Sequence, residues 1–228
     1  MSYAFEPAPT PSIPIVESEQ RYAVHRIYCV GRNYADHAKE MGAAVERGTP
    51  MFFMKPADAI VTDGADVPYP SVTNDLHHEV EMVVALHSGG RNIDASSALQ
   101  HVYAYAVGLD LTRRDLQSAA KTKGHPWDIA KGFDASAPVS ALRPIGTNAH
   151  PEHALLSLSV NGTQRQRSDI GEMIFSVSEI IAELSKLFEL RAGDLIYTGT
   201  PAGVAALNRG DSFLATLEGV GELRGHIS

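Results

Sequence analysis

The pattern of apolar and polar residues predicts many short strands and few helices. Apolar runs rich in β-branched and aromatic residues, ending at glycine or proline, are typical of strands. Such runs lie at residues 26–31 ("RIYCVG") and 51–61 ("MFFMKPADAIV"). The second run is expected to break at Pro56, because proline has no N–H to donate to a neighbouring strand. Residues 76–86 ("LHHEVEMVVAL") predict a third strand.

Helical periodicity is clearest over residues 176–190 ("SVSEIIAELSKLFEL"), where apolar positions follow the 3.6-residue period. Ser178 is the expected N-terminal cap of this helix. Shorter helices are expected over residues 33–42 and 96–101. Residues 113–124 have a helical composition, but the pattern leaves both a helix and an irregular turn open.

The last third of the chain predicts further strands. Residues 155–166 ("LLSLSVNGTQRQ") alternate apolar and polar positions ahead of an Asn-Gly pair, which is a strong signal for a β-hairpin. A strand and a glycine-rich turn are expected over residues 193–204, and closing strands over residues 210–227. Strands dominate, so the predicted class is α+β with a mixed or mainly antiparallel sheet.

The N-terminal segment differs from the rest of the chain. Four prolines lie between residues 7 and 14, and proline favours an extended chain over a helix. We therefore expect residues 1–20 to form an extended N-terminal arm and residues 21–228 to form a single domain. With 228 residues, 44% of them hydrophobic, the chain is long enough to bury the core of such a domain.

Charge and composition narrow the classes of partner. The formal net charge of −8 argues against nucleic acid and anionic membranes, which favour surfaces rich in lysine and arginine, and leaves a small-molecule ligand. Cys29 is the one cysteine, so no intrachain disulfide can form and a cytoplasmic location is expected. No apolar run reaches the ~18 residues needed to span a bilayer, and residues 1–20 do not resemble a signal peptide.

The strand predicted over residues 76–86 carries two acids on one face. Side chains alternate between the faces of a strand, so Glu79 and Glu81 lie side by side, with Cα atoms roughly 6.5 Å apart. Two ionised carboxylates this close repel each other unless a cation lies between them. Mg²⁺ and Mn²⁺ prefer oxygen ligands. Asp110, at the end of the apolar run "YAYAVGLD", supplies a third acid.

A solvated strand face is the alternative interpretation of this pattern. In that case Glu79 and Glu81 face water, and the histidines before them are ordinary surface residues. Val83 and Ala85 lie on the same face and argue against it, because a solvated face stays polar along its length. Zinc is a less suitable ion, because the lone Cys29 and the scattered histidines lack the spacing of zinc ligands.

Three further segments carry candidate catalytic or binding groups. His37 and Glu40 are three residues apart, so the carboxylate can orient the imidazole and leave its other nitrogen basic, although such pairs are common on exposed helices. Lys131 lies between apolar neighbours and needs either an anionic partner or a route for its ammonium group to water. The small residues around Thr198 and Thr200 suit a bound carboxylate, and they lack the lysine of a phosphate-binding loop.

Six ordered segments together resemble the fumarylacetoacetate hydrolase family, and within it the smaller acylpyruvate and fumarylpyruvate hydrolases. The segments are "YCVGRNYADHAKEMG", "FMKPADAIV", "DLHHEVEMVVAL", "VGLDLTRRDLQ", "KGHPWDIAKGFDASAPV" and "GDLIYTGTPAGV". The resemblance implies a mixed β-roll of that family's C-terminal-domain type, flanked by short helices. It also implies assembly as a homodimer.

The resemblance implies roles for individual residues as well. Glu79, Glu81 and Asp110 match the family's metal-binding acids, so they are expected to hold Mg²⁺ or Mn²⁺. His37 and Glu40 match its water-activating pair, which the family carries on a mobile segment that becomes ordered over the substrate.

The remaining matches concern the substrate, a small 2-oxo acid. Lys131 matches the lysine that stabilises oxyanion charge, and Arg114, Gln117 and Thr200 fall where the family contacts substrate oxygens. The implied activity is metal-dependent hydrolysis of a carbon–carbon bond in an acylpyruvate, such as fumarylpyruvate to fumarate and pyruvate in gentisate-type aromatic catabolism. The alternatives are decarboxylation of oxaloacetate, or isomerisation or decarboxylation of unsaturated 2-oxo or 2-hydroxy dioates, on the same metal site. A non-catalytic metal-binding or interaction protein is the alternative from another class.

Overall fold

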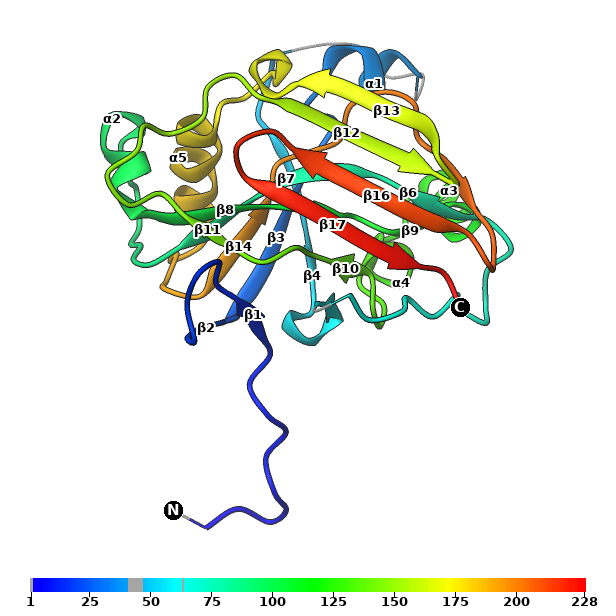
Figure 1. Ribbon diagram of the computed structural model, residues 1–228. Coiled ribbons are helices and arrows are strands. Elements are labelled where there is room, and N and C mark those ends of the chain that lie inside the picture. Colours follow the sequence, from blue (N-terminus) through cyan, green and yellow to red (C-terminus); the bar gives the residue numbers. More distant parts are fainter. Residues whose placement is uncertain (1, 41–46, 63) are drawn as a thin grey trace.

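Two sheets packed against each other form the body of the protein (Figure 1). The computed structural model describes residues 2–40, 47–62 and 64–228. The larger sheet has the strand order β11 (Arg143–Pro144), β8 (Val102–Leu109), β7 (Val80–Leu86), β14 (Asp194–Tyr197), β3 (Arg26–Gly31) and β4 (Met51–Lys55). The smaller sheet has the order β13 (Thr163–Asp169), β12 (Leu155–Val160), β16 (Ser212–Leu217) and β17 (Gly221–His226).

The pairing in the larger sheet is mixed. Strand β14 pairs in parallel with β3 and antiparallel with β7, and the other neighbouring pairs are antiparallel. The shorter pairings are β15 (Ala205–Leu207) and β9 (Thr112–Arg113) on either side of β6 (Leu76–His78), β1 (Ser12–Pro14) with β2 (Arg21–Ala23), and β10 (Ala137–Pro138) with β5 (Ile60–Val61). The predicted α+β class with mixed sheets is therefore confirmed.

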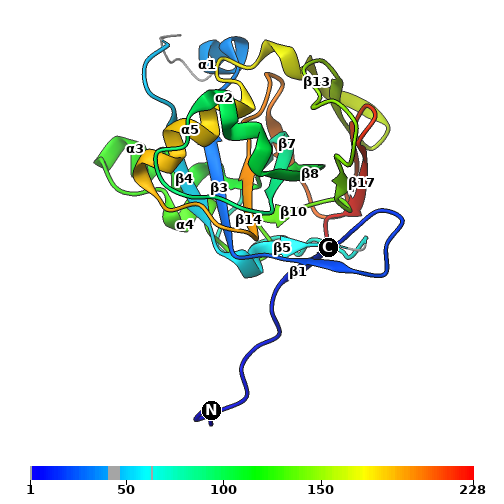
Figure 2. The same cartoon turned by 90° about the vertical axis from the view of Figure 1, so that its left-hand side faces the viewer.

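Short helices surround these sheets. They are α1 (Ala35–Glu40), α2 (Ala95–Ala98), α3 (Arg114–Lys123), α4 (Asp128–Lys131) and α5 (Val177–Leu187), with 3-10 turns at Ala57–Ala59, Leu99–His101 and Ile170–Glu172. Helices α2 and α5 lie together beside one end of the sheets, as Figures 1 and 2 both show. No helix among the described residues is long and apolar enough to cross a membrane.

The core lies on both faces of the larger sheet. Val80, Met82 and Val84 of β7 belong to the apolar cluster that includes residues of the smaller sheet and α5. Val83 and Ala85 belong to a second apolar cluster on the opposite face. Strand β7 is consequently buried along its whole length, so an acid on either face of this strand lies in the protein interior.

Most predicted elements are present, and the structure settles the open one. Residues 114–123 form helix α3, which ends at Gly124 in the left-handed conformation that glycine adopts readily. The 51–61 run breaks at Pro56, as expected. The turn of the predicted hairpin, Asn161 and Gly162, has positive φ at both residues. The last two residues of the helix predicted over 33–42 lie outside the described residues.

The predicted cap of helix α5 was wrong. Ser176, not Ser178, is the N-cap, because its hydroxyl accepts a hydrogen bond from the Glu179 N–H. The Glu179 carboxylate accepts in return from the Ser176 N–H over 2.9 Å. Only this serine therefore completes a capping box.

The segment before residue 21 contacts the body of the protein. Strand β1 pairs with β2, and Ile13 is fully buried in the second apolar cluster. The chain is thus already packed against the body of the protein at residue 13. The division into an arm of residues 1–20 and a domain of residues 21–228 stays a prediction.

Candidate active site

Three carboxylates meet where strands β7 and β8 lie side by side. Glu79 lies in the break between β6 and β7, Glu81 follows on β7, and Asp110 comes directly after β8. Glu81 is opposite Gly108 in the antiparallel pairing. The Asp110 N–H donates to the Glu79 C=O over 2.8 Å. One carboxylate oxygen from each of the three acids lies within 4.8 Å of the others.

All three acids are buried. Glu79 is 5% exposed, and Glu81 and Asp110 are each 1% exposed. The interpretation of a solvated strand face is therefore wrong, because packing covers β7 on both faces. A buried cluster of oxygen donors without cysteine or histidine fits Mg²⁺ or Mn²⁺ better than zinc.

Basic side chains offset part of this negative charge. Lys131 Nζ donates to Glu79 Oε2 over 2.7 Å and to Asp110 Oδ2 over 2.6 Å. Lys55 Nζ lies 2.8 Å from Asp110 Oδ1, and Arg114 forms an ion pair with Glu79. Lys131 is only 2% exposed, so its ammonium group reaches anionic partners rather than water. We call Glu79, Glu81, Asp110 and Lys131 the floor of the site.

Two acids of the floor differ in their affinity for protons. Burial raises the pKa of Glu79, but the positive charge of Lys131 and neighbouring cations outweigh burial and hold it well below its usual value. Burial and the negative charges of Asp110 and Glu79 raise the pKa of Glu81 well above its usual value, and the hydrogen bond from the Gly199 N–H only partly opposes this. Without a cation between the acids, Glu81 is therefore the one that takes up a proton.

Helix α1 brings a histidine and a glutamate to the same site. His37 Nδ1 lies 3.3 Å from Glu40 Oε2, and the Gly203 N–H donates to both oxygens of Glu40 at 3.2 Å. Burial lowers the pKa of His37, against the opposing effects of the Glu79 charge and of Glu40. The imidazole is therefore neutral at neutral pH. It donates from Nδ1 to Glu40, which leaves Nε2 as a base.

The three residues expected to contact substrate oxygens also lie here. Arg114 Nη1 donates to Gln117 Oε1 over 2.6 Å, one turn along α3. Thr200 Oγ1 accepts from Gln166 Nε2 over 2.8 Å, so the Thr200 hydroxyl hydrogen is available to an acceptor in the site. Gln166 is fully buried, and its Oε1 accepts from the Val80 N–H at the start of β7.

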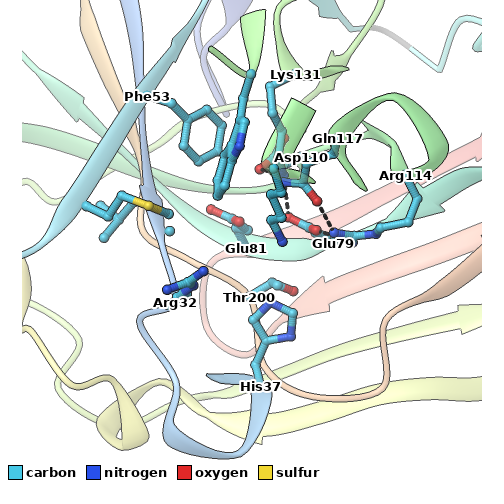
Figure 3. Close-up of a pocket in the computed structure, with 15 residues that line it drawn as sticks. Arg32, His37, Phe53, Glu79, Glu81, Asp110, Arg114, Gln117, Lys131 and Thr200 are labelled. Atoms are coloured by element: carbon cyan, nitrogen blue, oxygen red, sulfur yellow. Dashed lines mark hydrogen bonds and ion pairs between the residues drawn. The ribbon is translucent and has the colours of Figure 1, made fainter. Parts of the chain in front are cut away.

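One cavity is lined by the three acids together with His37, Arg114, Gln117, Lys131 and Thr200. In Figure 3, Glu79 and Glu81 lie between Lys131 on one side and His37 on the other. The nine predicted site residues are therefore brought together, apart from Glu40, which contacts the site through His37. The cavity is also lined by apolar and basic residues that the sequence did not single out: Met51, Phe53, Trp127, Arg32 and Lys121.

Lys55 and Gln166, which were not identified from the sequence, have only weak local signals in it. Lys55 is a lysine inside an apolar strand, which indicates that it has a buried partner. The sequence does not reveal that this partner is Asp110, 55 positions further along the chain. Gln166 is 88 residues from His78, whose Nδ1 donates to it over 2.9 Å. Such contacts depend on which strands pair, and residue spacing alone does not give that pairing.

Comparisons with known proteins are consistent with this geometry. The family model described as "Fumarylacetoacetate (FAA) hydrolase C-terminal" matches residues 26–228. The crystal structure of fumarylpyruvate hydrolase from Pseudomonas aeruginosa, in complex with Mn²⁺ and pyruvate, is similar with a TM-score of 0.97. It shares 49% sequence identity, with 99% of each chain covered.

Two sequence relatives carry a different name. The mitochondrial oxaloacetate tautomerase of Rattus norvegicus is 44% identical over 198 residues, which cover 87% of this chain and 89% of the relative. The oxaloacetate tautomerase of Escherichia coli (strain K12) is 42% identical over 199 residues, which cover 87% of this chain and 90% of the relative. Proteins similar to this chain thus include enzymes of two activities.

Proposed function

Since the chain belongs to the fumarylacetoacetate hydrolase family, we propose that it is a metal-dependent enzyme that hydrolyses a carbon–carbon bond of an acylpyruvate. Fumarylpyruvate is the proposed substrate, and fumarate and pyruvate are the products. The observation that carries this proposal is the neutral, buried His37, held by Glu40 in the same cavity as three clustered acids. The similarity to a fumarylpyruvate hydrolase over 99% of both chains supports it.

We propose that Glu79, Glu81 and Asp110 hold Mg²⁺ or Mn²⁺. The donor set fits, because three buried carboxylates lie within 4.8 Å and one of them, Glu81, would otherwise need a proton. The cation, when bound, supplies a Lewis acid that polarises the keto acid and stabilises the negative charge that develops on it. The structurally similar hydrolase from Pseudomonas aeruginosa contains Mn²⁺.

His37 is the proposed general base. Its Nε2 takes a proton from water, while the Glu40 carboxylate stabilises the imidazolium through Nδ1. The water oxygen bonds to the carbonyl carbon at the fumaryl side, and the adjacent carbon–carbon bond then breaks. The electron pair of that bond passes to the pyruvate half as an enolate, which takes up the proton from His37 to give pyruvate and restores the neutral base.

The remaining polar side chains orient the substrate and carry charge. Lys131 lies where it stabilises negative charge that develops next to Glu79 and Asp110. Thr200 donates its hydroxyl hydrogen to a substrate oxygen, since its own oxygen is already occupied by Gln166. Arg114 and Gln117 hold the carboxylate end of the keto acid.

A second candidate is tautomerisation of oxaloacetate. The two relatives named as oxaloacetate tautomerases, at 44% and 42% identity, favour it. This reaction needs a proton moved between carbon and oxygen but no attack by water. Decarboxylation of oxaloacetate, and isomerisation or decarboxylation of unsaturated dioates, would use the same acidic cluster.

One experiment tests the proposal directly. The purified protein is incubated with fumarylpyruvate in Mn²⁺ buffer, loss of the enol-diketone absorbance is followed, and the products are separated. We expect fumarate and pyruvate in equal amounts, and no turnover after chelation of the metal. Keto–enol exchange of oxaloacetate is measured on the same sample. Fast exchange of oxaloacetate with no cleavage of fumarylpyruvate would replace the hydrolase by the tautomerase.

The homodimer and the cytoplasmic location remain our predictions. Light scattering on the purified protein measures the first. A tagged copy of the full chain, followed by cell fractionation, measures the second.

A further inference from the structure

The exposed edge of the cavity, which we call its mouth, carries two positively charged side chains that have no role in the proposed reaction. Arg32 and Lys121 line the same cavity as the three acids, and both residues are exposed. The other basic residues of its lining, Arg114 and Lys131, are paired with Glu79. Among the described residues, no carboxylate forms an ion pair with Arg32 or Lys121. The mouth therefore presents positive charge that the described part of the chain does not neutralise.

Two aromatic rings, Phe53 and Trp127, lie next to each other in the cavity lining, one close to Lys131 of the floor and the other close to Lys121. Lys131 Nζ lies 4.9 Å from the centroid of the Phe53 ring, and that centroid is 6.2 Å from the centroid of Trp127. Lys121 Nζ lies 5.1 Å from the Trp127 ring centroid. The cavity lining thus combines buried acids, two aromatic rings and two exposed basic side chains.

The backbone of Arg32 has a conformation that non-glycine residues rarely adopt. Its φ of 59° lies in the left-handed region, directly after the end of β3. The next residue, Asn33, is fixed by a hydrogen bond from its side-chain amide to the Thr198 C=O over 2.7 Å. Backbone outliers that their surroundings hold in place are concentrated at functional sites. Figure 3 shows the Arg32 side chain beside the cavity.

Like charges gather around Lys121. Partial loss of solvent around the ammonium group lowers the pKa of Lys121, although the residue is exposed, and the positive charges of Arg114 and Arg32 lower it further. An anion bound between these groups relieves this repulsion. A carboxylate is the fitting anion, because guanidinium and ammonium groups form charge-assisted hydrogen bonds with it.

We propose that Arg32 and Lys121 form a carboxylate-binding subsite, which makes the enzyme select 2-oxo acids with a second carboxylate at the far end. The inference rests on the proposed function, in which the 2-oxo acid end of the substrate lies at the floor. Phe53 and Trp127 then contact the unsaturated middle of the chain. Fumarylpyruvate has this design, with a carboxylate at each end of seven carbons, whereas acetylpyruvate shares its 2,4-dioxo acid end but lacks the second carboxylate.

A pair of unreactive ligands tests the subsite without turnover. 2-Oxoheptanedioate and 2-oxoheptanoate differ only in the terminal carboxylate, and neither has the 4-oxo group that hydrolysis attacks. Calorimetry with the Mn²⁺-loaded protein should show that the dioate binds about tenfold tighter or more, as expected for a hydrogen bond between charged groups. Arg32→Gln and Lys121→Gln should each remove most of this preference and leave the affinity for the monoacid unchanged.

Lys123→Gln is the matched control. Lys123 lies on the same helix, α3, and its substitution changes the net charge equally, but it does not line the cavity. We expect it to keep the preference for the dioate. In turnover assays, Arg32→Gln should raise the KM for fumarylpyruvate about tenfold and change the kinetics with acetylpyruvate little.

The outcomes separate the two proposals. Equal wild-type affinity for the two ligands, or a preference that survives both substitutions, overturns the subsite. A dioate preference that both substitutions remove, in a protein that cleaves no diketo acid, supports the subsite and overturns the hydrolase. If Arg32→Gln does not fold, Lys121→Gln alone decides, because Lys121 is an exposed helical residue whose loss leaves no buried partner.

Discussion

The floor of the cavity and the His37–Glu40 pair face the same space but are held by different kinds of structure. Glu81 is part of β7, which is hydrogen-bonded to β8 on one side and to β14 on the other. Lys131 donates to three oxygen acceptors at once. His37 and Glu40 lie on α1, described over six residues, and Glu40 contacts the body of the protein through the Gly203 N–H.

This difference matches what each region does in the proposed reaction. Charges on the floor must stay in place while negative charge develops, since a preorganised site does not spend energy on rearrangement. His37 must accept a proton during the reaction, and the helix that carries it must leave the substrate a way into the cavity. Substitutions that remove a paired charge from the floor should therefore change both stability and activity, whereas substitutions in the pair should change activity more than stability.

Glu79→Gln should have the largest effect, because it removes a buried charge with two basic partners. Lys131 and Arg114 would each lose a carboxylate. Loss of one partner of a buried ion pair costs about 3–5 kcal/mol of unfolding free energy. We expect that loss in chemical denaturation of the metal-free protein, together with activity below detection. An unchanged denaturation midpoint would show that the floor does not depend on these pairs.

Glu81→Gln is the matched variant on the same strand, with the opposite expectation for stability. Without metal the raised pKa keeps the Glu81 carboxyl protonated, and glutamine has a similar shape and still accepts from the Gly199 N–H. The unfolding free energy of the metal-free variant should therefore differ from that of the wild type by less than about 1 kcal/mol. Mn²⁺ should raise the melting temperature of the wild type but not of Glu81→Gln, because the variant lacks one ligand. Equal stabilisation of both by Mn²⁺ would exclude Glu81 as a ligand.

His37→Ala should affect activity and leave the floor intact. Loss of a general base typically slows a reaction about 100- to 10,000-fold. We expect a fall of that size in kcat for fumarylpyruvate, with unchanged affinity for Mn²⁺ by calorimetry. If hydrolysis persists at the wild-type rate, water is activated by another group. If hydrolysis is lost while reaction with oxaloacetate persists, the second candidate activity is favoured.

The sequence predicted the acids of the floor better than it predicted the residues that hydrogen-bond to the floor and to its neighbours. Strand alternation places Glu79 and Glu81 on one face, and the end of an apolar run marks Asp110; both are local signals. The contacts of Lys55 and Gln166 join segments far apart in the chain, so they depend on strand pairing that local spacing does not encode. The wrong cap of α5 has a different origin, because the local sequence does distinguish the two serines: only Ser176 has a glutamate, Glu179, three residues later and completes the capping box.

Gln166→Met should reduce the stability of the protein more than it reduces the rate of the chemical step. Gln166 Nε2 donates to Thr200 Oγ1 and to the Pro201 C=O, each over 2.8 Å, and Oε1 accepts from the Val80 N–H. Methionine has a similar size but leaves these buried groups without a partner, at about 1–3 kcal/mol for each. We expect a clear fall in stability and a rise in KM of roughly tenfold, since Thr200 loses its orientation. Gln164→Met, on the exposed face of the same strand, should change stability by less than about 0.5 kcal/mol.

The smallest expected effect concerns the pH dependence that His37 gives to the reaction. Burial lowers the pKa of His37, so the base is neutral and kcat/KM should be constant down to about pH 6.5, the usual pKa of histidine, and fall only below it. The unfolded chain binds this proton at higher pH than the folded one. The contribution of His37 to stability is therefore complete above pH ~6.5 and is lost as the pH falls through the lower pKa of the folded state.

Glu40→Gln sharpens this test, because the Glu40 carboxylate raises the pKa of His37. Its removal should move the acid limb of the kcat/KM profile to still lower pH while kcat itself falls. Asp36→Asn, an exposed acid on the same helix that pairs with Lys39, should leave the limb where it is. A limb that moves to higher pH in Glu40→Gln would mean that the titrating group is not His37. The pair would then have to be assigned a role other than activating water.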